Sequence, residues 1–373
     1  MKFLFVCGGT AGHIKPALAI AGTLRDRMPD AEFLFVGSGR ELENRLIPQA
    51  GFEIVNISSA GFSRGKSLKS LAANAKSAAK LARGSVQARK IINSFEPDAA
   101  IGTGGYVCYP VLRCAAKKGI PTVVHESNAL PGMTIKMLSP LVDRVMVAFP
   151  DMEKLYKRPD RVIMTGTPVR SGFSTLTKEQ AKEKLGLSGR PVVVSFWGSL
   201  GADHMNDVMA DMIAENARED AFYHIHATGG GEKGLAAMRN RLSERGVKSL
   251  PEHLDLRPYI DDMPMVMTAS DVVLCRAGAS TLGELTAIGK PAILVPSPYV
   301  VDNHQEKNAS ALDRAGGAVM IKEPDCTGKL LFDAVKKLTA DEKKLVEMSE
   351  NLKRMGSADS AERIADIILS LCK

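Results

Sequence analysis

Residues 271–284 carry side chains of the types that bind a nucleotide. Asp271 to Cys275 is a β-branched and apolar run, typical of a short buried strand. A turn of small residues follows, and Ser280 and Thr281 are residue types that begin helices. Free N–H groups and the positive end of the helix dipole bind phosphate at such a helix start. The carboxylate of Glu284, one turn later, can accept two hydrogen bonds from a ribose diol.

Three glycine-rich turns, at residues 8–13, 102–107 and 198–202, also follow predicted strands, and a polar cluster ends another strand at 125–128. The first turn matches neither the dinucleotide fingerprint nor the P-loop, but we expect it to present backbone N–H groups to an anion or a sugar. The carboxyl ends of parallel strands converge on one edge of a sheet, so the turns of the N-terminal half should share a ligand site. The alternative for the polar cluster is that its side chains only cap a loop.

Strands and helices alternate along the chain, which predicts an α/β fold with two doubly wound parallel sheets facing a cleft. We expect an N-terminal domain over residues 1–163, joined by a C-terminal helix at 358–373, and a C-terminal domain over 164–357. The predicted strands are 2–7, 32–37, 53–57, 99–102, 122–125 and 142–148 in the first domain, and 191–196, 223–227, 254–257, 272–275, 292–295 and 318–321 in the second.

The bulk composition fits a two-domain enzyme. The chain has 373 residues, of which 45% are hydrophobic, and no apolar run approaches the roughly 20 residues that span a bilayer. The N-terminus shows no signal-peptide pattern. The six cysteines form no Cys-x-x-Cys pair, so neither a zinc site nor a disulfide framework is indicated. These features predict a reduced, cytoplasmic enzyme.

The net charge of +7 comes from the first 163 residues, since acidic residues outnumber basic ones in the remainder. Between Glu53 and Glu96 no acidic residue occurs, and basic residues recur at helical spacing in 64–92. This stretch is either a solvated surface helix or a helix that faces anionic lipid headgroups. Its Ala-rich apolar side is expected to pack on the sheet. The basic residues are Arg64, Lys66, Lys69, Lys76, Lys80, Arg83, Arg89 and Lys90.

Together, the order and spacing of these motifs resemble the MurG family, the peptidoglycan N-acetylglucosaminyltransferases of glycosyltransferase family 28. The resemblance implies the GT-B fold. It also implies inverting transfer of N-acetylglucosamine from UDP-N-acetylglucosamine to the C4 hydroxyl of undecaprenyl-pyrophosphoryl-MurNAc-pentapeptide (lipid I), which forms lipid II. The chain would then be a hexosyltransferase of cell wall biogenesis, and so of cell shape and cell division. The segments that carry the resemblance are 8–13, 104–106, 125–128, 166–170, 198–202, 275–279 and 302–309.

The resemblance also implies roles for individual residues. His13 is the first choice for the general base, since an imidazole titrates near neutrality, and Glu126 is the second; alternatively His13 only binds phosphate. The acceptor would meet Gly9, Gly104, Gly105 and Tyr106. The donor would meet Thr10, Ala11, Gly12, Asn128, Arg170, Ser199, Ile260, Gly278, Ala279, Ser280, Thr281, Leu282, Gly283, Glu284, His304 and Gln305.

Several positions depart from the family pattern. Ala11 and Trp197 stand where glycine is usual, Thr167 where asparagine is usual and Leu200 where glutamine is usual. His304 stands where some members carry glutamine. These departures bear on details of donor contacts.

The resemblance implies UDP-N-acetylglucosamine, lipid I, an anionic membrane surface and cell-wall synthesis proteins as partners, and no nucleic acid. No cofactor or metal is expected, since the chain has no Asp-x-Asp motif. The protein would be peripheral, at the cytoplasmic face of the membrane. The alternatives are another GT-B UDP-sugar glycosyltransferase with a different lipid acceptor, a UDP-sugar 2-epimerase, and a non-catalytic binder of anionic lipid or nucleic acid.

Overall fold

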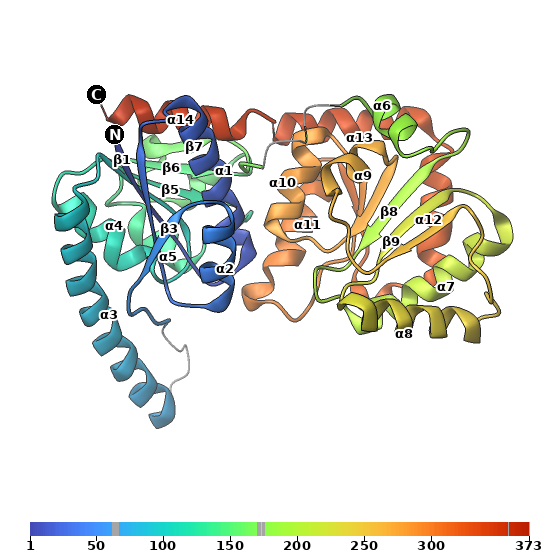
Figure 1. Cartoon of the computed structure of the whole chain (residues 1–373), viewed down its shortest axis with the longest axis horizontal. Helices are drawn as coiled ribbons and strands as arrows, with labels where there is room; N and C mark the ends of the chain where they lie inside the picture. The colour runs from blue at the N-terminus through green and yellow to red at the C-terminus, as the bar shows by residue number, and fades with distance from the viewer. Residues whose placement is uncertain (62–66, 170–172, 174–175, 357, 373) are drawn as a thin grey trace. The chain divides into compact units, whose positions relative to one another are not determined.

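The computed structural model describes residues 1–61, 67–169, 173, 176–356 and 358–372. The chain divides into two compact units (Figure 1). The first unit comprises Met1–Arg170 with Gly356–Lys373, and the second comprises Ser171–Met355. Each unit is an α/β layer structure around one parallel sheet, as the GT-B fold class predicts.

The first unit holds a parallel sheet of seven strands in the order β3-β2-β1-β4-β5-β6-β7. The sequence does not predict β7, a three-residue, half-buried edge strand that follows a proline-containing turn. Since β7 pairs with β6, the first unit extends beyond residue 163. The strands are β1 (Lys2–Cys7), β2 (Glu32–Gly37), β3 (Glu53–Asn56), β4 (Ala99–Gly104), β5 (Thr122–Glu126), β6 (Arg144–Val147) and β7 (Val162–Met164).

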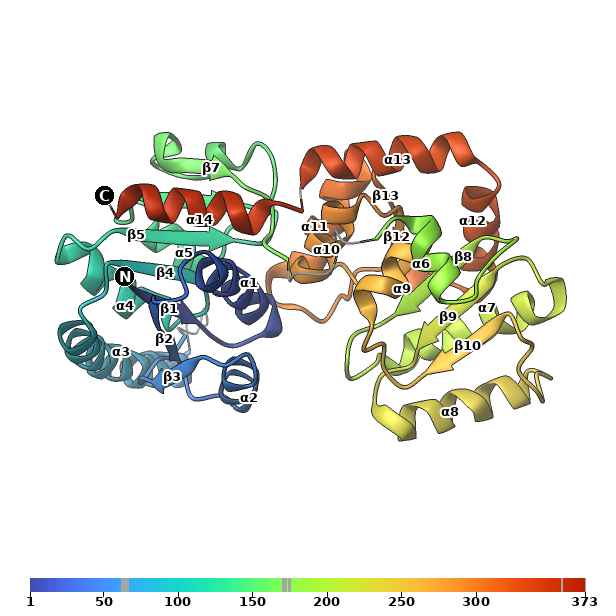
Figure 2. The same cartoon turned by 45° about the horizontal axis from the view of Figure 1, so that its top comes forward.

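Helices cover this sheet, and the last helix of the chain is one of them (Figure 2). Ile364 and Ile368 of α14 join the buried core that includes Ile14 and Leu24 of α1. Arg27 of α1 also forms ion pairs with two carboxylates of α14, at 3.3 and 2.7 Å. The helices are α1 (Ala11–Arg27), α2 (Glu41–Gln49), α3 (Leu68–Phe95), α4 (Cys108–Lys117), α5 (Met133–Leu138) and α14 (Ser360–Leu371).

Helix α3 packs on the unit with a face other than the predicted one. Gly84, Ala88 and Ile92 are buried on this face. The approach is close because Gly84 lacks a side chain, and a Cβ there would lie 2.1 Å from the Ser58 carbonyl oxygen. The Ala-rich face that the sequence predicts to pack is instead exposed at its described positions Leu71, Ala75, Ala78, Ala82 and Val86, and Val86 is 59% exposed. Figure 1 shows the N-terminal part of α3 extending past the sheet.

The second unit repeats the plan with a parallel sheet of six strands in the order β10-β9-β8-β11-β12-β13. Its core combines the sheet with α7 and α12, where Met209, Phe222 and Phe332 are fully buried. The strands are β8 (Val192–Phe196), β9 (Tyr223–Ala227), β10 (Leu254–Arg257), β11 (Val272–Cys275), β12 (Ala292–Leu294) and β13 (Ala318–Met320). The helices are α6 (Lys178–Lys184), α7 (Asp203–Glu219), α8 (Gly231–Glu244), α9 (Met263–Ala269), α10 (Ala279–Ile288), α11 (His304–Arg314), α12 (Gly328–Thr339) and α13 (Glu342–Met355).

Across the described helices, none is both long enough and apolar enough to span a membrane.

Candidate functional site

The two glycine turns of the first unit pack directly against each other. They follow β1 and β4, which are neighbours in the sheet. The Gly8 N–H donates to the Gly104 carbonyl oxygen at 3.2 Å. Gly104 and Gly105 both have positive φ, and a Cβ on Gly105 would lie 2.5 Å from the Gly8 carbonyl oxygen. Only glycine fits this approach. The next residue, Tyr106, is half exposed and lies over Gly61.

His13 lies on the first turn of α1, between these two loops. Its Nδ1 lies 2.7 Å from the Gly8 carbonyl oxygen. Because a carbonyl oxygen only accepts hydrogen bonds, Nδ1 carries the proton in the neutral ring, and Nε2 keeps its lone pair. The ring lies against Gly104, where a Cβ would come within 2.4 Å of Cδ2. The Thr103 hydroxyl donates to the His13 carbonyl oxygen at 2.7 Å. The imidazole is thus held in one orientation with an acceptor nitrogen available.

The Gly9 amide, expected to meet the acceptor, donates instead to a buried carboxylate. Its N–H points to Oε1 of Glu43 at 2.7 Å. The amides at the start of α1, from Thr10 to Gly12, remain at the helix N-terminus, and no acidic residue stands in that first turn. The anion-binding capacity of the loop therefore lies at Thr10, Ala11 and Gly12.

The cluster after β5 is tightly bonded within its own loop. Oε1 of Glu126 accepts from the N–H and the side-chain amide of Asn128, at 3.0 and 2.9 Å. Its Oε2 accepts from the Gly132 N–H at 2.8 Å. The ring of His125 is wholly buried and contacts the Gly166 carbonyl oxygen at 2.9 Å, and burial lowers its pKa to about 4. Glu126 thus shapes the loop, and Asn128 presents its side chain beside it.

In the second unit, α10 begins one residue before the predicted capping residues. Gly278 is the N-cap, with extended backbone, and no side chain caps the helix. Ser280 is inside the helix, and its hydroxyl oxygen is buried without a hydrogen-bond partner. A Cβ on Gly278 would meet nothing within 4 Å, so the amides of Ala279 and its neighbours lie behind open space. Glu284 is only 6% exposed, on the second turn of this helix.

The loop after β8 rests on the loop after β9. A Cβ on Gly229 would lie 2.2 Å from the Gly201 nitrogen, so the two backbones are in contact. The Gly230 N–H donates to the Ser199 carbonyl oxygen at 3.2 Å. On the other side, Gly198 faces open space and Leu200 is 89% exposed. The loop is fixed from behind and accessible in front, as an anion-binding loop must be.

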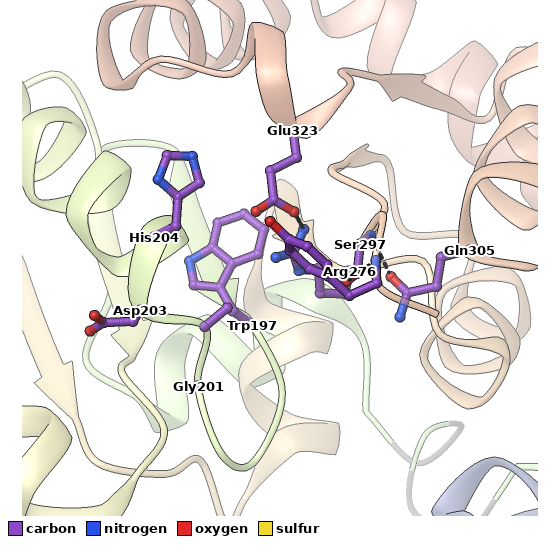
Figure 3. Close-up of a pocket in the computed structure, with 10 residues that line it drawn as sticks. Trp197, Gly201, Asp203, His204, Arg276, Ser297, Gln305 and Glu323 are labelled. Carbon is purple, nitrogen blue, oxygen red and sulfur yellow. Dashed lines mark hydrogen bonds and ion pairs between the residues drawn. The ribbon is translucent and has the colours of Figure 1, made fainter. Parts of the chain in front are cut away.

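A cavity of about 360 Å³ lies beside this loop (Figure 3). Arg276 lies over the Trp197 ring at 5.8 Å and forms an ion pair with Glu323 at 2.5 Å. Both charged side chains are largely buried, so they stabilise each other in a site of low dielectric. Among the predicted donor residues that the structure describes, only Gln305 lines this cavity. Its walls are Trp197, Gly201, Ala202, Asp203, His204, Arg276, Ser297, Tyr299, Gln305 and Glu323.

The segment before α11 has strained backbone. Asp302 and Asn303 both have positive φ, at 55° and 53°, which is unfavourable for residues with a Cβ. Gln305 accepts from the Ser297 N–H at 2.9 Å, and this bond, drawn in Figure 3, ties α11 to the loop after β12. His304 has its Nδ1 buried without a partner. Such strain is often retained where a segment contacts a ligand.

The remaining predicted residues are more dispersed. The side chain of Ile260 is 1% exposed, in the turn between β10 and α9, so only its backbone is available to a base. Arg170 lies outside the described residues. Thr281, Leu282 and Gly283 belong to the first turns of α10. Within the described part of the chain, no group of three or more His, Cys, Asp or Glu side chains is arranged to hold a metal.

The sequence did not single out Glu43, Arg276 or Glu323. Glu43 is one of two carboxylates in the first turn of α2, and nothing in its spacing distinguishes it from Glu41. Arg276 and Glu323 are far apart in sequence, so their pairing depends on the adjacency of β11, β12 and β13.

Comparison with known protein families gives two matches in succession along the chain. Residues 3–147 match the glycosyltransferase family 28 N-terminal domain, and residues 192–364 match the glycosyltransferase family 28 C-terminal domain.

Alignments with similar proteins cover the whole chain. A UDP-N-acetylglucosamine–N-acetylmuramyl-(pentapeptide) pyrophosphoryl-undecaprenol N-acetylglucosamine transferase of Acetivibrio thermocellus is 45% identical over 100% of this chain and 99% of its own length. A protein of the same name from Caldanaerobacter subterraneus subsp. tengcongensis is 41% identical over the full length of both. The crystal structure of Acinetobacter baumannii MurG aligns with a TM-score of 0.76 at 25% identity, covering 99% of each chain.

Proposed function

The chain belongs to the MurG family within glycosyltransferase family 28, and we propose that it transfers N-acetylglucosamine from UDP-N-acetylglucosamine to lipid I, forming lipid II. The observation that carries this proposal is the similarity to a transferase of that name, which is 45% identical over 100% of this chain and 99% of its own length. The chain is thus a hexosyltransferase of peptidoglycan synthesis. Its roles in cell wall biogenesis, cell shape and cell division follow from that product.

We assign the donor to the second unit. Two open, glycine-lined backbones, at Gly198 and Gly278, lie at the ends of the adjacent strands β8 and β11. The diphosphate would bind the amides there, as anions bind at helix N-termini. Glu284 would hold the ribose, the backbone at Ile260 the uracil, and Gln305 the sugar. His304 would support the sugar from the same helix, and Ser199 the phosphates.

We assign the acceptor to the first unit, where the first glycine loop and the turn at Gly104–Tyr106 lie side by side. Thr10, Ala11 and Gly12 of that loop would also meet the donor. Since His13 Nε2 keeps its lone pair, His13 would remove the proton from the C4 hydroxyl as the new bond forms. We prefer it to Glu126, because both oxygens of that carboxylate already accept hydrogen bonds from their own loop.

The leaving group is UDP, which gains negative charge in an oxocarbenium-like transition state. The N-terminus of α10 and the amides of the loop after β8 would stabilise that charge. Arg170, which lies outside the described residues, would add a positive charge, and Asn128 would bind the donor from the acceptor side. We propose that no metal or cofactor takes part.

We propose a peripheral position at the cytoplasmic face of an anionic membrane. The support is α3, where Lys76, Lys80 and Arg83 are exposed and Leu71 and Val86 are 68% and 59% exposed. Exposed basic and apolar side chains on one helix suit a headgroup surface. Other cell-wall synthesis proteins are further proposed partners, and nucleic acid is not.

The membrane proposal predicts that Lys80→Glu with Arg83→Glu weakens binding to vesicles of phosphatidylglycerol and phosphatidylcholine. Each Lys or Arg near an anionic membrane surface contributes about 1 kcal/mol to the binding free energy, so reversing the charge of two should weaken binding at least about tenfold. The matched control is Lys233→Glu with Arg239→Glu, two exposed positions on α8 of the second unit. Equal loss in both variants would contradict a specific role for α3.

Product analysis tests the reaction itself. With labelled UDP-N-acetylglucosamine and a lipid I analogue, we expect UDP and labelled lipid II analogue in equal amounts. Transfer to another lipid acceptor in place of lipid I would favour a related glycosyltransferase. Free N-acetylmannosamine would indicate a 2-epimerase, and lipid binding without turnover would indicate a non-catalytic protein.

Two substitutions test the assigned residues. His13→Ala should lower kcat by about 10²- to 10⁴-fold, the usual contribution of a general base, with little change in the KM for the donor. Glu284→Ala should raise the donor KM by about tenfold or more, because it removes hydrogen bonds to a charged acceptor. An unchanged donor KM in Glu284→Ala would contradict the ribose assignment.

A further inference from the structure

The buried carboxylate of Glu43 has five hydrogen-bond donors around it. Glu43 is completely buried on the first turn of α2. Oε1 accepts from the Gly9 N–H at 2.7 Å and from the Ser38 hydroxyl at 2.6 Å. Oε2 accepts from the N–H groups of Ser38, Gly39 and Arg40 at 2.6, 3.0 and 3.3 Å. Both oxygens of the carboxyl group thus accept hydrogen bonds, four of them from backbone N–H groups.

One of these donors belongs to the peptide group that also binds His13. The Gly8–Gly9 peptide gives its N–H to Glu43, and its carbonyl oxygen accepts from His13 Nδ1 at 2.7 Å. The two ends of a planar trans peptide point in opposite directions, so the carboxylate and the imidazole lie on either side of it. Hydrogen bonds in such a chain polarise one another, which makes the Gly8 oxygen a stronger acceptor.

This peptide cannot rotate without losing both bonds, and its surroundings are tightly packed. A Cβ on Gly8 would lie 3.0 Å from Glu43 Oε1, and a Cβ on Gly37 would lie 2.8 Å from Oε2. On the other side, Gly105 approaches the Gly8 oxygen and Gly104 lies against the His13 ring. These contacts therefore hold the carboxylate, the peptide and the imidazole in a fixed geometry relative to one another.

We propose that Glu43 is a positioning residue for His13, fixing the orientation and the Nδ1-protonated tautomer of the imidazole through the Gly8–Gly9 peptide. Nε2 then always faces outward as the acceptor nitrogen. In enzymes where a carboxylate bonds a catalytic histidine directly, it serves the same purpose; here one peptide group stands between the two. The kinetic consequence rests on the proposed function, but the tautomer does not.

Glu43→Gln breaks this link selectively. The amide oxygen of glutamine can still accept from the three N–H groups of Ser38, Gly39 and Arg40. Its NH₂ group then faces the Ser38 hydroxyl, which can accept, and the Gly9 N–H, which cannot. Ser38→Ala is the matched control, since it removes one hydrogen bond to the same Oε1 atom and leaves the Gly9 contact in place.

Nitrogen-15 NMR of histidine-labelled protein without substrates reads the tautomer, with the His13→Gln spectrum identifying the signal. We expect the Nδ1-protonated form in the wild type and in Ser38→Ala, and a mixture of tautomers in Glu43→Gln. An Nε2-protonated wild-type ring would overturn the proposal whether or not Glu43→Gln folds. An unchanged tautomer in folded Glu43→Gln would overturn it as well.

Kinetics separates positioning from general support of the fold. We expect kcat of Glu43→Gln to fall about tenfold to a hundredfold, as for a misplaced catalytic group, with the KM for UDP-N-acetylglucosamine within about twofold of wild type. Ser38→Ala should keep nearly the wild-type kcat. Wild-type kcat in His13→Gln would refute His13 as the base, while the NMR result would still decide the role of Glu43.

Discussion

The first glycine loop of each unit follows the first strand of its sheet, yet the two loops are supported differently. In the first unit, Glu43 takes the Gly9 amide and His13 takes the Gly8 carbonyl oxygen. In the second unit, the loop rests on the backbone of Gly229, and its front side at Gly198 is open. A loop whose peptide groups form hydrogen bonds within the protein can orient a side chain. A loop that is supported on one side only has backbone amides available to bind an anion on the other side.

The difference extends to the side chains near each loop. A negative carboxylate stands behind the first loop, where it would oppose a phosphate bound at Gly9 but assist an imidazole. Beside the second loop lie the Trp197 ring and the Arg276 guanidinium, whose charge Glu323 balances. The two units therefore share a topology but differ in the chemistry that the loop allows.

The largest expected effect comes from removing the aromatic support of the second loop. Trp197 is 3% exposed, and Trp197→Ala should lower the free energy of unfolding of the second unit by about 3–5 kcal/mol. Tyr299 lines the same cavity but is 87% exposed, which makes it the matched control. Tyr299→Ala should change the free energy of unfolding by about 0.5 kcal/mol or less. Urea titrations followed by circular dichroism measure both. Equal losses would mean that Trp197 does not support the loop.

Acidification should affect the second unit more than the first. His226 is buried beside His224, and desolvation lowers the pKa of His226 to about 4 and that of His224 well below its ordinary value. The unfolded chain takes up these protons near pH 6.5, whereas the folded unit resists them. The contribution of these neutral histidines to the free energy of unfolding is therefore fully present above pH 6.5 and is lost as the pH falls toward 4. For His226 alone this loss is about 3 kcal/mol. His125 gives the first unit one such group.

The single tryptophan of the chain, Trp197, lies in the second unit, so its fluorescence reports that unit during urea unfolding. We expect a lower urea midpoint at pH 4.5 than at pH 7.5, and a smaller difference in His226→Gln, which removes one of the buried imidazoles. The same midpoint at both pH values would show that the buried histidines do not govern acid stability.

A pair of glycine substitutions tests the contact between loops. Gly229 and Gly231 have similar positive φ, 68° and 63°, so alanine at either position costs about 1 kcal/mol in backbone strain. At Gly229 the new Cβ would also meet the Gly201 nitrogen at 2.2 Å, whereas at Gly231 it meets nothing within 4 Å. Gly229→Ala should thus cost about 1–3 kcal/mol more, by tryptophan fluorescence in urea. Equal costs would refute the backbone contact as the support of this loop.

The sequence was sufficient to predict most of the fold. Runs of β-branched and apolar residues between turns located twelve of the strands, since buried parallel strands have continuous apolar sequences. Short, half-buried β7 lacks that pattern. Helix α3 was assigned the wrong packing face, because alanine fits either a buried or an exposed position. The close approach at Gly84, which fixes the face, depends on a Ser58 carbonyl 26 residues earlier in the chain.

Within the candidate site, the glycine turns were predictable because positive φ and close backbone approach restrict the residue type. Their supports were not. Glu43 contacts Gly9 only because β1 and β2 are neighbours, and its sequence environment is that of an ordinary helix start. The sequence also placed the start of α10 too late, at Ser280 and Thr281, whereas Gly278 is the N-cap. Capping propensity alone does not determine where a helix begins.

The smallest expected effect concerns Leu200, at the tip of the second loop. Its side chain is 89% exposed, so Leu200→Gln, which introduces the residue that the family resemblance leads us to expect here, should change the free energy of unfolding by less than about 0.5 kcal/mol. The new amide could add one hydrogen bond to the donor, lowering its KM by up to about fivefold. Steady-state kinetics and urea titration measure the two effects. A marked loss of stability would mean that Leu200 packs on the loop. A change confined to KM would instead assign this side chain a role in donor binding, on the open side of a loop whose other side rests on the loop after β9.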